Sequence, residues 1–314
     1  MRFWMLPALL AIVVAGAFAS AGPTSAAEPI AFTIKFPPGQ IDHQTVSMDM
    51  DQTISSPLLP APKKQTMKMT AKTTLKQVKS DASGSTVEVT YDSVKLSGSM
   101  LGQAASDELD KTLSAFVGEK ITLHFAPNGK ADKVDGVDTI VNKLPAGVGQ
   151  TAIKQFLSDD RIKDQFNSGI EQILPTKPVS VGDTWETDIS HKVSAVEVKI
   201  KSEVKFVGLD EVDGHKLAKL EFTGKGKLEV AGAAGTPKFN VQQFDQNGTA
   251  EFDLTRGWIS LQKVDQHMVG DVNLNIGPNP ASMKIDQAVK VTSTLTPSKP
   301  DDATAEAKKP EAAK

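Results

Sequence analysis

The 314-residue sequence contains no cysteine, one tyrosine and three tryptophans. Without cysteine, the chain has no disulfide framework, no thiolate ligand for a metal ion and no cysteine nucleophile. So few tyrosines and tryptophans argue against an outer-membrane β-barrel, whose lipid-facing strands are flanked by girdles of these residues. The formal net charge is only −3, which gives no electrostatic reason to expect nucleic acid or an anionic membrane surface as a partner.

Signatures of catalysis are also missing from the sequence. There is no nucleophile elbow, phosphate-binding loop or Gly-rich dinucleotide turn. The five histidines form neither a helical metal pair nor a zinc spacing, and we interpret them as polar surface or edge residues: His43, His124, His191, His215 and His267. We therefore expect no catalytic residue, no metal site and no cofactor.

The one long apolar run lies at the start of the chain. Met1 and Arg2 precede apolar residues 3–19, and small residues then lead to Ser25-Ala26-Ala27. A positive start, a short apolar core and a small-residue ending predict a secretory signal over residues 1–27. The alternative is a membrane anchor, but a spanning helix needs about 18 or more apolar residues and this run is marginal. We expect an exported protein, in the periplasm or outside the cell, with no transmembrane span after cleavage.

Beyond this run, apolar and charged residues alternate with a period of two, the pattern of β-strands whose successive side chains point to opposite faces. Residues 196–206 show it most clearly, and it returns after a turn at residues 210–214, which predicts an antiparallel hairpin. The Asn247-Gly248 pair predicts a further tight hairpin turn. Other strands are predicted at residues 30–36, 43–54, 67–76, 87–91, 119–126, 184–193, 238–254, 257–276 and 283–295.

The alternation stops in residues 103–174. There, apolar residues recur at helical spacing in residues 106–117 and again in residues 150–174, where Ser158-Asp159-Asp160 can start a second helix. These apolar stripes need a surface to cover, and the apolar face of the sheet offers one.

Together these patterns predict a mainly β (α+β) protein. We expect one long antiparallel curved sheet with two or three helices packed on its concave face, forming either a half-barrel or a closed barrel, because periodicity does not fix strand order. The predicted organisation is a signal peptide (residues 1–27), a single β-rich domain (28–296) with a helical insertion at about 103–174, and a disordered Pro, Ala, Lys and Glu tail (297–314).

Two glycines mark a candidate site. Gly224 and Gly226 fall on the same strand face as Phe222, where a packed sheet normally places large side chains. The space that they leave can admit a closely packed helix, a sharp bend of the strand or a ligand. If it admits a ligand, we predict a cavity lined by Phe206, Phe222, Gly224, Gly226, Phe166 and Ile170. Methionines, which fill irregular apolar space, recur on the predicted strands.

One segment resembles a known family. Ile173-Leu174-Pro175 followed by Val181-Gly182-Asp183-Thr184-Trp185, together with residues 255–258, is similar to exported bacterial β-rich proteins grouped as a domain of unknown function, number 6263. Proteins of this group look like half-barrel lipid carriers of the LolA and LppX kind. The resemblance implies a concave apolar cavity closed by helices, and it assigns no catalytic role to Asp183 or Trp185.

The leading hypothesis is an exported, non-catalytic protein that binds a lipid or another apolar small molecule between sheet and helices. The alternative is a structural or envelope-associated interaction protein with a filled core and no small ligand. Neither predicts nucleic acid as a partner, and the sequence does not identify protein partners.

Overall fold

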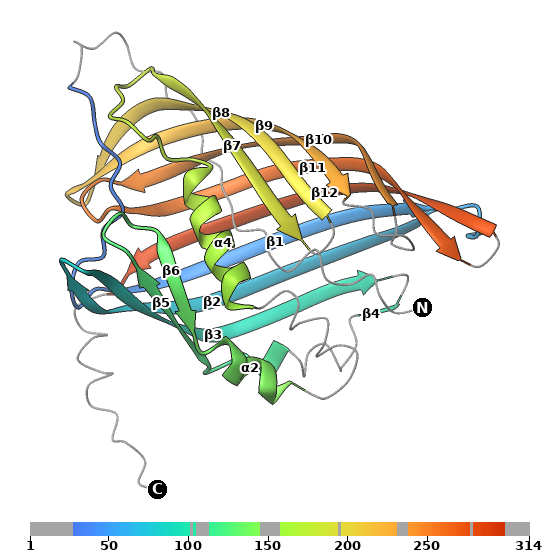
Figure 1. Cartoon of the computed structure of the whole chain (residues 1–314), viewed down its shortest axis with the longest axis horizontal. Helices are drawn as coiled ribbons and strands as arrows, with labels where there is room; N and C mark the ends of the chain where they lie inside the picture. The colour runs from blue at the N-terminus through green and yellow to red at the C-terminus, as the bar shows by residue number, and fades with distance from the viewer. Residues whose placement is uncertain are drawn as a thin grey trace, which may run out of the picture.

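A single antiparallel sheet dominates the structure (Figure 1). The computed structural model describes residues 28–100, 103–104, 113–144, 158–193, 196–230, 238–276 and 279–298. The strands are β1 (Ile41–Ser55), β2 (Lys63–Asp81), β3 (Gly84–Met100), β4 (Gln103–Ala104), β5 (Lys120–Phe125), β6 (Ala131–Asp135), β7 (Thr184–Val193), β8 (Val196–Val212), β9 (His215–Val230), β10 (Lys238–Asp253), β11 (Trp258–Ile276) and β12 (Asn279–Pro297).

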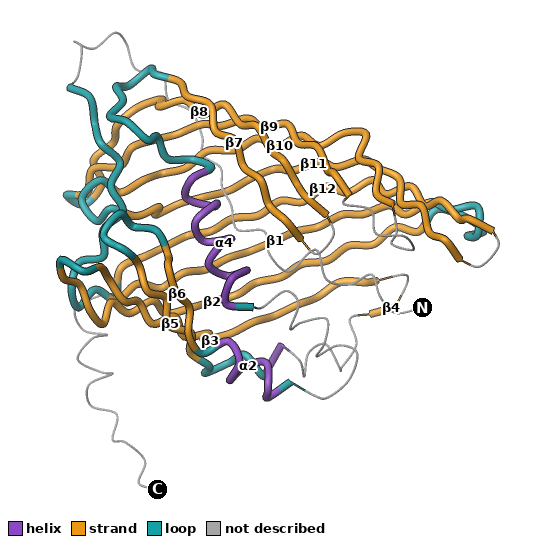
Figure 2. Tube along the Cα trace, in the orientation of Figure 1, coloured by secondary structure: helices purple, strands orange, loops and turns teal. Residues whose placement is uncertain are grey.

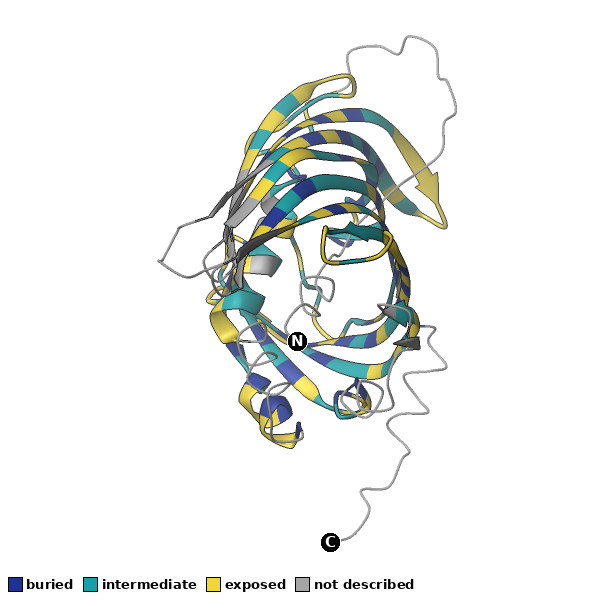
Figure 3. Cartoon of the chain, turned by 90° about the vertical axis from the view of Figure 1, so that its right-hand side faces the viewer, coloured by how far each residue is buried: buried dark blue, intermediate teal, exposed yellow. Residues whose placement is uncertain are grey.

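The strand order is β6-β5-β3-β2-β1-β12-β11-β10-β9-β8-β7, with β4 paired to β3 outside this path. Seen along the long axis of the molecule, the sheet curls around on itself (Figure 3). Its two ends, β6 and β7, do not pair with each other within the described residues, so the sheet stays open. The predicted fold class is confirmed, and the half-barrel is the form that the chain adopts.

The period-two pattern gives each long strand an inward and an outward face. In β8 and β9, Val204 lies opposite Phe222, and both are buried. One position along, Lys205 lies opposite Glu221 on the other face. The inward face of the sheet is therefore apolar and the outward face charged, as the alternation predicts.

Two helices are described, α2 (Val137–Lys143) and α4 (Asp159–Glu171). Helix α4 contacts both β6 and β7 and so spans the two open edges of the sheet (Figure 2). Asn167 of α4 donates from Nδ2 to the Ala131 carbonyl of β6 at 2.8 Å and accepts from the Ala131 N–H at 2.7 Å. Thr187 Oγ1 of β7 donates to the carbonyl of Gln172, just after α4, at 2.9 Å. The helix therefore occupies the position that a further strand takes in a closed barrel.

The predicted helices are only partly tested. Helix α4 confirms the second half of the prediction for residues 150–174, and most of residues 106–117 lie outside the described residues. Helix α2 was not predicted from the sequence, because its seven residues are too few to establish a helical period.

The N-terminal segment, residues 28–40, crosses one end of the sheet (dark blue at the left of Figure 1). The predicted strand at residues 30–36 is wrong, because only Ile30 forms a β-bridge, to Val179. Further on, Lys35 donates its N–H to the Gly257 carbonyl at 3.0 Å. The segment is held by separate contacts with several turns instead of by one neighbouring strand.

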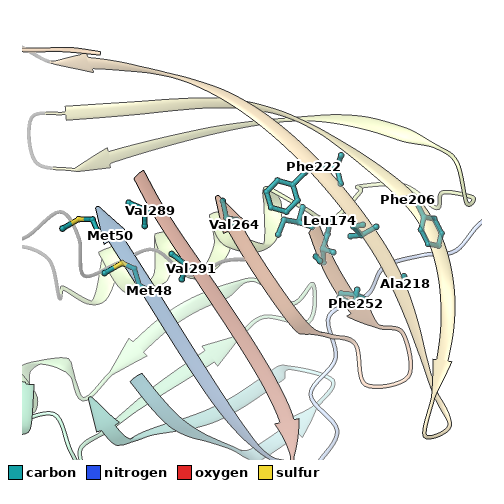
Figure 4. Packing of buried hydrophobic residues seen from close by; sticks show 14 of the residues in the cluster. Met48, Met50, Leu174, Phe206, Ala218, Phe222, Phe252, Val264, Val289 and Val291 are labelled. Atoms are coloured by element: carbon teal, nitrogen blue, oxygen red, sulfur yellow. The ribbon is translucent and has the colours of Figure 1, made fainter. Parts of the chain in front are cut away.

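The interior contains two apolar clusters. The larger includes Met48, Phe206, Phe222 and Phe252, and the smaller centres on Leu123 and Phe125. Figure 4 shows the larger cluster lying along the inward faces of the strands that run from β1 through β12 to β8. Ile170 of α4 packs against the larger cluster and Phe166 of α4 packs against the smaller one. The helix therefore contacts both clusters.

The predicted turn at Asn247-Gly248 is also wrong. Both residues lie inside β10, where Asn247 is opposite Thr223 and Gly248 is opposite Phe222. On the inward face, the small Gly248 leaves room for the Phe222 side chain opposite it. This contact between strands overrides the preference of an Asn-Gly pair for a tight turn.

Candidate functional site

Four of the six predicted cavity-lining residues lie on the inward face of the sheet, and the other two, Phe166 and Ile170, lie on α4. Phe206 and Phe222 are 0% and 2% exposed and belong to the larger cluster, against which Ile170 packs. Phe166 lies in the smaller cluster, where its ring centroid is 5.5 Å from that of Phe125 and 5.8 Å from that of Trp258. The structure thus divides the predicted set between two clusters instead of gathering it around one point.

Gly224 and Gly226 face inward in β9, on the face that was predicted. A Cβ atom at Gly226 would lie 2.5 Å from Phe244 Cδ1 of β10, and one at Gly224 would lie 2.7 Å from Ser202 Oγ of β8. The room that these glycines leave is therefore filled by side chains of the two neighbouring strands. The sequence left a helix, a bend of the strand or a ligand open for this space, and the described contacts at both glycines are with the neighbouring strands.

The end of the interior nearest the N-terminal segment is packed. The Phe32 ring lies 5.5 Å from that of Phe206 and 5.2 Å from that of Phe252, and the Phe36 ring lies 4.3 Å from that of Phe125. The alternation in residues 30–36 indicated that Phe32 and Phe36 share one face, but it did not identify the core residues that they contact, because the segment pairs with no neighbouring strand. The N-terminal segment closes this end of the half-barrel.

A buried ion pair lies at the same closed end. The Arg256 guanidinium, in the turn between β10 and β11, donates to the Asp42 carboxylate at the start of β1, and both side chains are 10% exposed. Burial lowers the pKa of Arg256. The pair joins the sheet to the turn against which Lys35 is held, so its role at this end is structural.

Toward the opposite end, burial of the inward apolar side chains is uneven: Val272 and Ile285 are still buried, but several of their neighbours are not. Phe206, Leu220 and Phe252 are fully buried, whereas five inward apolar residues further along the sheet are only partly buried: Ile54, Leu96, Phe244, Met268 and Met283. Phe244 lies directly opposite Met268, so two of these residues are adjacent on neighbouring strands. The concave face thus carries apolar side chains that the described core does not fully cover.

Polar side chains form rows within this apolar face. Gln52 accepts from Gln65 Nε2 at 3.4 Å and donates to Gln287 Oε1 at 3.1 Å, across β2, β1 and β12. Gln246 and Ser202 are each 2% exposed and lie on either side of Gly224. Gln246 Nε2 and Ser202 Oγ have no hydrogen-bond partner among the described residues. Two buried donors thus lie unpaired within the described part of the inward face.

A cavity lined mainly by charged residues lies outside the interior of the sheet. The cavity, of about 600 Å³, lies between β6, α2 and α4, and its lining includes Asp132, Asp135, Asp138, Asp159 and Asp160. Desolvation, followed by the charges of Asp138 and Asp135, raises the pKa of Asp159. Lys133 and Lys163 lie at 2.8 Å from Asp135 and Asp160 and offset part of this negative charge. Within the described residues, no group of three or more His, Asp or Glu side chains is placed to hold a metal ion.

With this geometry established, comparison with known proteins gives a family. A family model described as "Family of unknown function (DUF6263)" matches residues 64–259, more than half of the chain. The chain belongs to this family. The resemblance seen in the sequence is thereby confirmed. The DUF6263 match covers β2 to the start of β11 and so includes Gly224 and Gly226, whereas β1 and β12, which link the two halves of the sheet, lie outside it.

No curated protein matches this DUF6263 chain. Among solved structures, lipovitellin is similar at 10% identity and a TM-score of 0.41, over 84% of this chain and 26% of the lipovitellin chain. The chain therefore spans about a quarter of the length of that protein. A domain described as an outer membrane lipoprotein-sorting protein, from Vibrio parahaemolyticus, is similar at 10% identity and a TM-score of 0.12, covering 84% of this chain and 90% of that one.

An outer membrane channel from Pseudomonas putida F1 is similar to the DUF6263 chain at 8% identity and a TM-score of 0.18, covering 86% of this chain and all of the other. At such identities and TM-scores these likenesses carry no argument about function. Within the described residues, no helix is long and apolar enough to cross a membrane.

Proposed function

We propose that this protein is an exported, non-catalytic binding protein that holds an apolar, lipid-like ligand against the concave face of its sheet. The observation that carries the proposal is the partly accessible inward apolar surface at Ile54, Leu96, Phe244, Met268 and Met283. Apolar surface of this kind is favourably removed from water by an apolar ligand. Two flexible methionines allow it to adapt to ligands of irregular shape.

Two further features support this function. The N-terminal segment packs one end of the half-barrel and α4 spans its open edges, so the apolar face is sheltered on these two sides. Gln246 Nε2 and Ser202 Oγ, buried without a described partner, can donate to an ester or carbonyl oxygen if their side chains rotate toward a ligand. Export rests on the predicted signal at residues 1–27, which lies outside the described residues.

The alternative function, a structural or envelope-associated protein with a filled core, has one observation in its favour. The spaces beside Gly224 and Gly226 are occupied by Ser202 and Phe244. Under this alternative, the partly accessible apolar residues at the end of the sheet away from the N-terminal segment do not bind a small molecule.

Binding of a fluorescent apolar probe, N-phenyl-1-naphthylamine, separates the two functions. We expect saturable binding that weakens in Met268→Gln, a change that keeps the side-chain length but places an amide on the inward face. The matched control is His267→Gln, the adjacent residue on the outward face, where the ring contacts Asp286 at 2.9 Å. Equal weakening in both variants, or no saturable binding by the unaltered protein, would favour the structural alternative.

A further inference from the structure

The turn between β1 and β2 has an unusual composition for a surface loop. Residues 57–62 read Pro-Leu-Leu-Pro-Ala-Pro, with no polar side chain. All except Leu59 are exposed, and Leu58, at 64%, has the largest exposed fraction among the described large apolar residues. Surface loops are normally polar, and packing within the chain does not explain this sequence.

The turn is held in shape. Ile54 lies opposite Lys63 in the β1–β2 ladder, which fixes the base of the turn. The Leu58 N–H donates to Ser56 Oγ at 3.2 Å, and the Leu59 N–H donates to the Ser56 carbonyl at 3.0 Å. Three prolines restrict the backbone further. Binding through Leu58 and Leu59 therefore does not require the turn to be ordered at a large entropic cost. The turn lies near the right-hand end of the long axis in Figure 2.

Three lysines lie at the base of the turn. Lys63 and Lys64 follow it directly, and Lys284 of β12 lies opposite Ser55 at its base; all three are exposed. None of them forms an ion pair within the described residues. Three carboxylates lie on the same strands: Asp286 contacts His267, Asp271 lies opposite Lys284 and accepts from Gln242 Nε2 at 2.5 Å, and Asp51 lies further along β1 from the turn.

We propose that this turn, residues 56–64, is a docking site for an anionic phospholipid bilayer. Leu58 and Leu59 enter the boundary between headgroups and acyl chains, and the lysines contact lipid phosphates. The net charge of −3 does not reveal such a site, because it sums over the whole chain and not over one end of it. The proposal is independent of a ligand inside the sheet, although the turn is at the end of the molecule away from the packed N-terminal segment.

The absence of cysteine allows a direct test. A single cysteine introduced by Leu58→Cys is labelled with an environment-sensitive fluorophore. The control is Val212→Cys, an exposed position at the end of β8, beside the turn at the opposite end of the molecule. Vesicles contain either equal parts of phosphatidylcholine and phosphatidylglycerol or phosphatidylcholine alone. We expect a blue shift of the fluorophore at position 58 with the anionic vesicles and none at position 212. A site-specific probe also separates this contact from any binding through residues 3–19.

Vesicle sedimentation gives a second measurement. Lys63→Gln/Lys64→Gln should weaken binding to anionic vesicles by roughly 25-fold, at about fivefold per lysine, and Leu58→Ser/Leu59→Ser by about tenfold or more. Leu209→Ser/Val212→Ser, which removes two exposed apolar residues at the other end, should leave binding unchanged. Equal fluorescence changes at positions 58 and 212, or unchanged binding of the turn variants, would overturn the proposal.

Discussion

At the scale of single residues, the inward glycines show how a strand makes room for its neighbours. Gly226 lies where the Phe244 ring of β10 crosses over β9, and Gly224 lies beneath Ser202 of β8. The sequence predicted correctly that both glycines face inward, because that follows from the period of two. What fills the space could not be predicted, because it depends on the registers of two nonlocal strand pairs.

We predict that Gly226→Ala lowers the free energy of unfolding by about 1–3 kcal/mol, because the new Cβ forces the Phe244 ring to move. Without this contact, alanine would be the better strand residue, so the sign of the effect is informative. Urea denaturation measures it. Gly208→Ala in β8 is the control, since a Cβ there meets nothing within 4 Å and should not destabilise the protein. If the loss at Gly226 persists unchanged in a Phe244→Leu background, the ring contact is not its cause.

The single tyrosine provides a prediction about pH. Tyr91 lies in β3 with its ring centroid 5.8 Å from that of Phe116, and burial raises its pKa above the ordinary value of 10.0. The folded state therefore binds the phenol proton more tightly than the unfolded state. Its contribution to stability is complete below pH 10.0 and is lost as the pH rises toward the higher folded-state pKa.

Since the chain has one tyrosine, its ionisation can be followed by near-ultraviolet absorbance without overlap from others. We expect a titration midpoint above 10.0 in the folded protein and a smaller loss of stability at alkaline pH in Tyr91→Phe. A midpoint at or below the ordinary value would show that the ring is solvated.

At the scale of elements, α4 lies between the two edge strands of the sheet, β6 and β7, and contacts both. Asn167 satisfies both backbone groups of Ala131 on the β6 edge, and the segment after α4 is held to β7 through Thr187. Open sheet edges otherwise pair with other chains. The apolar stripe of this helix was predicted from the sequence, but its bridging position was not, because no local pattern encodes that β6 and β7 remain unpaired.

Asn167→Ala should lower the free energy of unfolding by about 1–3 kcal/mol through loss of two hydrogen bonds to the β6 edge. It should also increase self-association, which analytical ultracentrifugation detects. The control in the same helix is Gly169→Ala, an exposed position where the change should raise stability by up to about 1 kcal/mol. Stability equal to that of the unaltered protein for Asn167→Ala would show that α4 does not hold this edge.

At the scale of the whole molecule, the half-barrel depends on the pairing of β1 with β12, near the two ends of the described chain. Most strands were predictable from their alternation, but the short strands β4 and β6 were not, and the β8–β9 hairpin followed from its short turn. The β1–β12 pair and the contacts of the N-terminal segment were not predictable, because they join residues far apart in the sequence; Gln44 and Ser293, which are in contact, are 249 positions apart. The family resemblance was predicted from a short segment before Trp185 and is now confirmed.

The measurement that tests the central claim most directly is native mass spectrometry, with solvent extraction, of the protein purified from the envelope of its own cells. We predict a bound lipid-like molecule that is depleted in Met268→Gln and retained in His267→Gln, together with a mature chain that lacks residues 1–27. A protein that carries no apolar molecule, and whose stability is unchanged by added lipids, would contradict a binding function and leave the structural role.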